Sequence, residues 1–279
     1  MFLLPALAGI LGGIVEVLLK ITVSKKYSSV TYVFLINSLV TLIMIPFVLS
    51  GSKFPSTFYP WLILVFNILM YIGSNLCLIT AFKYEDISNV SLIYRISLVL
   101  TFFMDLLLFK EVIDLAKLLG IIFISLAIVI VFFDREKFNN LKIKGILFAL
   151  ATGIFVSFAN IAAKFNSNFF TSNIFIFFMF SGQAFSMLFF PSVKSEMKKL
   201  FLQENKKLFL IAILGLTSYF LLIESYRRYS VSISYIIISA VSIAIVVIYG
   251  IYILQEKRKL LNKLVGLIFV IVGLFLLRR

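Results

Sequence analysis

Long apolar segments alternate with short polar segments along the chain, and this alternation is the strongest pattern in the sequence. An α-helix needs roughly 20 apolar residues to cross the hydrocarbon core of a bilayer, and segments of about that length recur from end to end. The pattern predicts ten helices, at residues 2–22, 31–50, 59–82, 90–109, 115–133, 143–163, 170–191, 206–224, 231–254 and 260–277.

The polar segments between these helices are predicted to be loops. They include KKYSS after the first helix, DREKFNNLKIK after the fifth and KSEMKKLFLQENKK after the seventh. A chain in lipid must satisfy its backbone amides internally, so continuous apolar segments of this length indicate helices. A membrane barrel would instead alternate polar and apolar residues. The fold class is therefore an all-α membrane protein.

Composition places the whole chain in lipid. Of the 279 residues, 62% are hydrophobic and 14% charged, too apolar for helices that keep one face in water. The net charge of +14 sits in short clusters between apolar segments, which is typical of loops that face anionic lipid rather than of nucleic-acid binding. We expect a multi-pass protein of the cell (inner) membrane, a monomer, whose first apolar segment spans the bilayer.

The residue inventory excludes several kinds of chemistry. The chain has no histidine and a single cysteine, Cys77, so histidine metal sites and Ser-His or Cys-His nucleophiles are excluded. It carries neither a Walker-type phosphate loop nor a GxSxG elbow. We therefore expect no enzyme activity, no cofactor, no metal and no direct use of ATP.

The chain aligns with itself at an offset of about 144 residues. Because apolar residues match by chance, only charged and glycine positions carry weight. The matched pairs are Gly9 with Gly153, Glu16 with Asn160, Lys20 with Lys164, AFKYEDIS at 81–88 with SYRRYSVS at 225–232, Glu111 with Glu256, and Gly120 with Gly266. This predicts two five-helix repeats, residues 1–138 and 139–279.

An odd number of helices in each repeat determines the arrangement. The second copy must enter the membrane from the opposite side, so the repeats are inverted around a central cavity, as in many secondary transporters. Lys and Arg are concentrated in the loops on one side, which indicates the cytoplasmic face. This bias predicts that the linker between repeats is inside and that both termini are outside.

The order of features resembles a known family. A glycine-rich first helix ending in Lys20, the turn at 81–88, a fourth helix ending at Lys110-Glu111 and a fifth containing Gly120 resemble the EamA-like branch of the drug/metabolite transporter superfamily. The resemblance covers nearly the whole chain in duplicate. It implies a ten-helix bundle that moves small metabolites such as amino acids, commonly outward. The proline frequent early in that family's fourth helix is absent, and Tyr94-Arg95-Ile96-Ser97 stand there.

Ionisable residues inside membrane helices are costly and each needs a reason. Glu16 is the first candidate, because small multidrug-resistance relatives of the superfamily resemble this helix in carrying an essential glutamate. It would bind an amine or a proton; alternatively, Lys20 neutralises it at i,i+4 spacing. Lys20 and Lys164 have a coupling role or extend to the headgroups. Arg95 clamps a carboxylate or phosphate, or anchors the helix at the interface.

Polar residues at related depths complete the predicted substrate site. Ser74 and Asn75 match Ser218 and Tyr219 in the other repeat, although hydrogen bonds between helices would explain such residues equally well. The remaining predicted members are Tyr94, Asn160, Tyr235 as a cavity wall, and Ser239 as the counterpart of Arg95.

The leading hypothesis is a secondary transporter that exports amino acids or related small metabolites by alternating access. It would act as a uniporter or as an antiporter coupled to protons. The alternatives are an efflux pump for lipophilic cations and, from another class, a lipid-handling protein or intramembrane enzyme. The expected partners are a small-molecule substrate, protons in the antiport case, and the bilayer.

Overall fold

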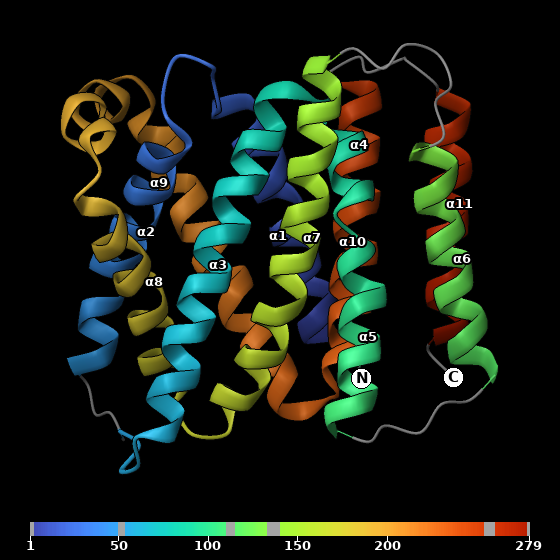
Figure 1. The fold of residues 1–279 in the computed structure, drawn as a ribbon, viewed down its shortest axis with the longest axis horizontal. Helices are drawn as coiled ribbons and strands as arrows, with labels where there is room; N and C mark the ends of the chain where they lie inside the picture. The colour runs from blue at the N-terminus through green and yellow to red at the C-terminus, as the bar shows by residue number, and fades with distance from the viewer. Residues whose placement is uncertain (1–2, 50–53, 110–114, 133–139, 254–259, 278–279) are drawn as a thin grey trace.

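A computed structural model describes residues 3–49, 54–109, 115–132, 140–253 and 260–277, and throughout these residues the regular structure is helical (Figure 1). The helices are α1 (Leu3–Thr22), α2 (Ser29–Leu49), α3 (Tyr59–Tyr84), α4 (Ile87–Ile93), α5 (Ile96–Phe109), α6 (Leu115–Phe132), α7 (Asn140–Ser167), α8 (Ser172–Leu188), α9 (Pro191–Arg228), α10 (Val231–Tyr252) and α11 (Leu260–Leu277).

The helices confirm a multi-pass membrane protein. Each of the ten predicted segments overlaps at least one helix. Among the described residues, seven spans are long and apolar enough to cross a bilayer, with Ile87–Phe109 taken as one, and α8 is a shorter apolar helix. The predicted boundary at residue 138, and Glu111 and Glu256, lie outside the described residues.

The span predicted at 90–109 is present as one candidate span, Ile87–Phe109, but its helix is not continuous, because the backbone breaks between α4 and α5 at Tyr94 and Arg95. Around the break the amide of Arg95 donates to Leu92 O at 3.3 Å and that of Ser97 donates to Tyr94 O at 3.1 Å. These are i to i−3 bonds, which tighten the helix locally. The break therefore forms without the proline that the family resemblance would place there.

The prediction of a loop at KSEMKKLFLQENKK is wrong. This segment is the first part of α9, which has a non-helical residue at Glu204. Leu200 of the segment and Val193 just before it are buried, while the lysines of the segment are exposed. Glu196 holds it against the α1–α2 connection by accepting from Ser28 N at 2.7 Å and Thr31 Oγ1 at 2.9 Å. An amphipathic helix lying outside the hydrocarbon has a loop-like composition.

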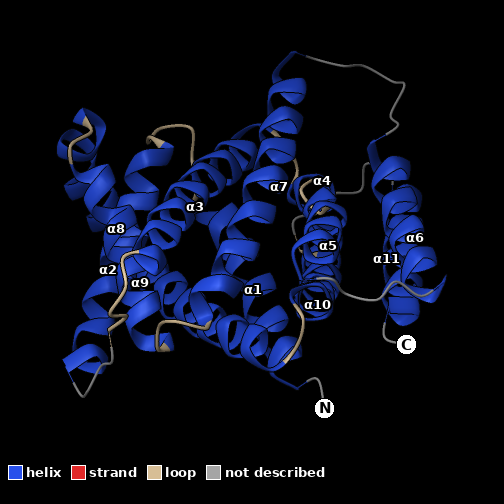
Figure 2. Ribbon diagram, turned by 60° about the horizontal axis from the view of Figure 1, so that its bottom comes forward, coloured by secondary structure: helices blue, strands red, loops and turns tan. Residues whose placement is uncertain are grey.

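Packing between the two halves is reciprocal. Helix α1 packs against α9 and α10, and α7, which lies 144 residues later, packs against α3 and α5. The remaining principal contacts join α2 to α8 and α6 to α11. Figure 2 shows α6 and α11 together at one edge of the bundle, with α1, α3 and α7 in the middle. An apolar core that includes Val40, Phe102, Phe175 and Tyr226 connects the halves.

Two glycines let α1 and α7 approach the opposite half closely. A Cβ on Gly9 would lie 2.6 Å from Ile238 O, and one on Gly153 would lie 2.7 Å from Tyr94 O. Both glycines and both carbonyls are separated by 144 residues. Any side chain larger than hydrogen would therefore force the helices apart at two related places.

Candidate functional site

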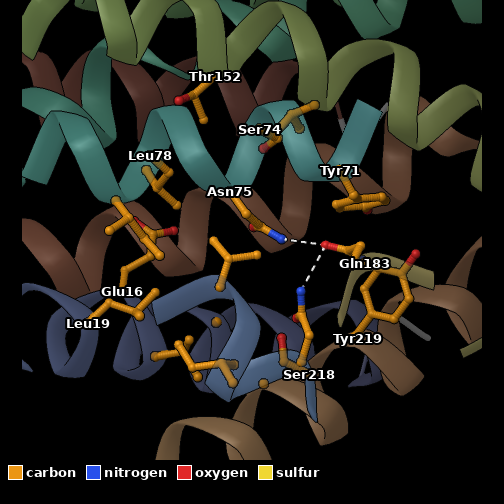
Figure 3. Close-up of a pocket in the computed structure, with 18 of the residues that line it drawn as sticks. Glu16, Leu19, Tyr71, Ser74, Asn75, Leu78, Thr152, Gln183, Ser218 and Tyr219 are labelled. Atoms are coloured by element: carbon orange, nitrogen blue, oxygen red, sulfur yellow. Dashed lines mark hydrogen bonds between the residues drawn. The ribbon is translucent and has the colours of Figure 1, made fainter. Parts of the chain in front are cut away.

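A partly open cavity of about 270 Å³ lies between helices of both halves. Its walls come from α1, α2, α3, α7, α8 and α9, together with the α4–α5 break and Tyr235 of α10. Figure 3 shows Glu16 at one end and Tyr71, Gln183 and Tyr219 at the other. The cavity thus has a charged end and an uncharged polar end.

At the charged end, Glu16 and Arg95 form a buried ion pair. Arg95 Nη2 donates to Glu16 Oε1 at 3.1 Å, and their side chains are only 4% and 11% exposed for Arg95 and Glu16 respectively. The spacing along α1 offered Lys20 as the partner of Glu16, but the structure gives it Arg95 from the break. A buried pair of opposite charges avoids the large cost of an isolated buried charge.

Neutral groups complete the shell around this pair. The carboxylate of Glu16 also accepts hydrogen bonds from Tyr94 OH, from Ser91 Oγ at 2.6 Å and from Ser242 Oγ at 3.0 Å. Arg95 donates further to Ser242 Oγ at 3.0 Å and to Ser239 Oγ at 3.3 Å. Its guanidinium carbon lies 4.3 Å from the centre of the Tyr94 ring, a cation–π distance.

The break in the helix is what brings Arg95 to Glu16. Tyr94 ends α4 and α5 starts at Ile96, so Arg95 lies between two helices at the depth of the cavity. Irregular backbone at membrane depth is tolerated where protein or a cavity covers it. Here α7 covers it through Gly153, whose Cα hydrogen faces Tyr94 O.

The uncharged end is built around Gln183 of α8. Its Oε1 accepts from Asn75 Nδ2 at 2.9 Å and from Asn37 Nδ2 at 3.2 Å, the two dashed bonds in Figure 3. Its Nε2 donates to Met179 O at 3.1 Å within the helix. Amides from α2, α3 and α8 therefore meet at one oxygen.

Tyrosines form much of the remaining wall. Tyr71 OH donates to Asn160 Oδ1 at 3.5 Å, and the rings of Tyr71 and Tyr219 meet edge to face with centroids 5.5 Å apart. Tyr235 lines the cavity and its OH lies 2.8 Å from Ser97 Oγ. The prediction that Tyr235 is a cavity wall agrees with this placement.

The structure brings most of the predicted site residues together around one cavity: Glu16, Ser74, Asn75, Tyr94, Arg95, Asn160, Tyr219 and Tyr235. Ser239 lies behind Arg95 as its hydrogen-bond partner. Lys20 and Lys164 do not line the cavity. Lys20 Nζ donates to Phe82 O and Glu85 O, and Lys164 Nζ donates to Tyr226 O and Tyr229 O.

Four polar cavity residues were missed by the sequence analysis: Asn37, Tyr71, Thr152 and Gln183. The available signal was an amide alone within an apolar segment, as Asn37 and Gln183 are in α2 and α8. Asp105 lies away from the cavity, where its carboxylate accepts from Ser232 N at 2.9 Å and so caps α10. Glu224 pairs with Arg227 at 3.6 Å.

Comparison with known proteins identifies the family. The profile of the EamA-like transporter family matches residues 1–133 and again residues 143–279. The chain belongs to the EamA-like transporter family. This duplicated match confirms the family resemblance and places the cavity inside a transporter.

A solved structure agrees with this EamA-like fold. That structure, described as a crystal structure of a protein, is 16% identical in sequence and superposes with a TM-score of 0.65, covering 99% of this chain and 95% of its own. At that identity the likeness concerns the fold alone. No curated protein matches the sequence. This EamA-like protein is thus an integral membrane transporter of small molecules.

Proposed function

We propose that the protein is a secondary transporter that exports amino acids or closely related metabolites by alternating access. The observation that carries the proposal is the cavity between the two halves, which presents one carboxylate and one guanidinium, Glu16 and Arg95. A zwitterion has the complementary pair of charges. Its carboxylate would take the place of Glu16 on Arg95, and its ammonium would take the place of Arg95 on Glu16.

The size of the cavity supports a small substrate. Sites for drug-sized ligands span about 300–1,000 Å³, and this cavity of about 270 Å³ lies below that range. The exchange of partners also leaves the number of buried charges balanced, which avoids an uncompensated ion in a site of low dielectric constant. A proton bound to the Glu16 carboxylate would be the alternative to the substrate ammonium.

Alternating access would come from two inverted five-helix repeats, residues 1–138 and 139–279. The reciprocal packing of α1 and α7 supports this arrangement, as does the bond between Arg95 and Ser239, which are 144 residues apart. A residue that contacts its own counterpart lies close to a two-fold axis. An axis through the cavity wall would let each repeat form one gate.

The inversion predicts that corresponding turns emerge on opposite faces of the membrane. In a Cys77→Ala background, single cysteines would replace the exposed residues Lys25 and Asn168, which follow α1 and α7. An impermeant thiol reagent applied to intact cells should label one position and reach the other only after permeabilisation. Labelling of both from the same side would contradict the inverted arrangement.

Transport itself is tested in proteoliposomes loaded with a labelled amino acid mixture. Efflux above that of protein-free vesicles is expected, because the cavity accepts a zwitterion. An inward proton gradient that accelerates this efflux would indicate antiport, and equal rates with and without the gradient would indicate uniport. The absence of any protein-dependent efflux of amino acids would overturn the proposed substrate class.

The alternative function is efflux of lipophilic cations. The aromatic wall favours it, since Tyr71, Phe180 and Tyr219 lie near one another and aromatic faces attract cations. Deletion that sensitises cells to several unrelated cationic compounds, without change in amino acid release, would favour this alternative. Arg95 opposes it, because a second cation in the cavity would be repelled.

A further inference from the structure

The three amides at the uncharged end have unused hydrogen-bonding capacity. A side-chain amide has two N–H donors and a carbonyl oxygen with two lone pairs. Asn37 and Asn75 each donate one N–H to Gln183 Oε1. Each therefore retains one N–H and its own Oδ1, and both residues line the cavity.

Two neighbouring groups at the same end lack partners. Asn160 Nδ2 and Tyr219 OH are buried and make no hydrogen bond within the part of the chain that the structure describes. Both residues line the cavity, and Asn160 is only 1% exposed. Buried polar groups are nearly always paired, so these two groups indicate that the hydrogen bonding at this end of the cavity is incomplete.

The charged end of the cavity differs, because groups of the protein already occupy most of the hydrogen-bonding positions of Glu16. Glu16 accepts four hydrogen bonds, from Ser91, Tyr94, Arg95 and Ser242. A substrate that reaches Glu16 must therefore replace existing bonds, whereas at the amide end it adds bonds. Selection between substrates of equal charge is consequently strongest at the amide end.

We propose that Asn37, Asn75 and Gln183 form a specificity subsite for a neutral side-chain group that both donates and accepts hydrogen bonds, best matched by a carboxamide. This inference rests on the proposed amino acid transport. The carbonyl of the ligand would accept from the remaining N–H of Asn37 or Asn75, and its amino group would donate to an Oδ1. Gln183 positions the two asparagines through its bonded oxygen.

Apolar and charged side chains of similar size would bind this subsite less well than a carboxamide. A leucine side chain has the shape of the asparagine side chain but no polar atoms, so it would leave the amides unpaired. An unpaired buried group costs about 1–3 kcal/mol, which corresponds to a preference of about fivefold to about 140-fold. A charged side chain would meet only neutral amides here and lose its hydration without a counter-ion.

The test compares two isosteric probes, labelled L-asparagine and L-leucine, in counterflow into proteoliposomes. The natural protein should exchange asparagine at least about fivefold better than leucine. Asn75→Leu, which keeps the shape of the side chain and removes its polar atoms, should abolish that preference by slowing asparagine without slowing leucine. Asn37→Leu provides a second variant from another helix. The control is Ser186→Ala, on the same helix as Gln183 but exposed and bonded to Gly182 O.

Each outcome has a defined meaning. Loss of the asparagine preference in Asn75→Leu or Asn37→Leu, with Ser186→Ala unchanged, supports the subsite. If the natural protein exchanges both probes equally, the subsite is overturned and amino acid transport is retained. The same follows if Asn75→Leu and Asn37→Leu reduce the exchange of asparagine and of leucine equally. Natural protein that exchanges no amino acid overturns the proposed function itself, and the subsite with it.

Discussion

The two halves of the molecule share their packing residues and differ in their cavity residues. Gly9 and Gly153 make the same close approach to a carbonyl of the other half. The corresponding cavity positions carry different residues, since Glu16 aligns with Asn160 and Arg95 aligns with Ser239 at the 144-residue offset. The duplicated halves thus share a packing frame at these glycines, while the two buried charges, Glu16 and Arg95, both belong to the first half.

Comparison of the two glycine contacts shows that close packing by itself does not accompany a break in the contacted helix. Gly153 lies on Tyr94 O at the break, yet Gly9 lies on Ile238 O in the middle of the continuous helix α10. A glycine contact alone therefore does not interrupt a helix. What distinguishes the broken segment is Arg95, whose guanidinium binds Glu16 across the interface.

The largest expected effect comes from removing the charge that distinguishes the halves. Glu16→Gln leaves Arg95 buried without its counter-ion, which should lower stability by about 3–5 kcal/mol. The change is measured as a fall in the thermal unfolding midpoint of the detergent-purified protein. At the matched position of the other half, Asn160→Leu should cost only about 1 kcal/mol, because its Nδ2 has no described partner and its Oδ1 accepts a long bond of 3.5 Å from Tyr71 OH.

A double variant provides the control for this prediction. In Glu16→Gln with Arg95→Gln both charges are absent, so much of the lost stability should return while zwitterion transport does not. Equal losses in Glu16→Gln and Asn160→Leu would show that the ion pair contributes no more than its uncharged counterpart, and the contrast between the halves would fail.

A smaller effect is expected where the halves agree. Gly9→Ala and Gly153→Ala should each destabilise by about 1–3 kcal/mol, because the added methyl group would crowd a backbone oxygen. Gly215→Ala is the matched control, since a Cβ there meets nothing within 4 Å. It should stabilise α9 by about 1 kcal/mol through helix propensity, and thermal unfolding compares all three.

Similar losses for the two crowded glycines would support a symmetric frame. If Gly9→Ala were neutral while Gly153→Ala unfolded the protein, the two contacts would not be equivalent. The sequence repeat at an offset of 144 residues would then not correspond to equivalent packing in the two halves.

Sequence was sufficient for features that repeat over many residues. The apolar segments located the spanning helices, and the glycine and lysine offsets located positions that the structure uses in matching ways. It was insufficient at the break between α4 and α5, where the backbone departs from a regular helix. Nothing local in Tyr94-Arg95-Ile96-Ser97 marks a break, and Glu16, which Arg95 reaches across the break, is 79 residues away along the chain.

The composition of the cavity shows the same limit. Glu16 and Arg95 were found because ionisable residues are rare inside membrane helices. Gln183 and Asn37 were missed because a lone amide in an apolar helix has no local signature of its direction. Only the packing of α2 against α8 brings their side chains within 3.2 Å of each other.

Helix α9 has a consequence for how the chain enters the bilayer. Its 38 residues would extend about 57 Å if straight, nearly twice the roughly 30 Å of hydrocarbon. The bend at Glu204 divides this length into a basic segment suited to the phosphate layer and a span of suitable length. The bend therefore limits the part of α9 that has to lie in hydrocarbon to the residues that follow Glu204.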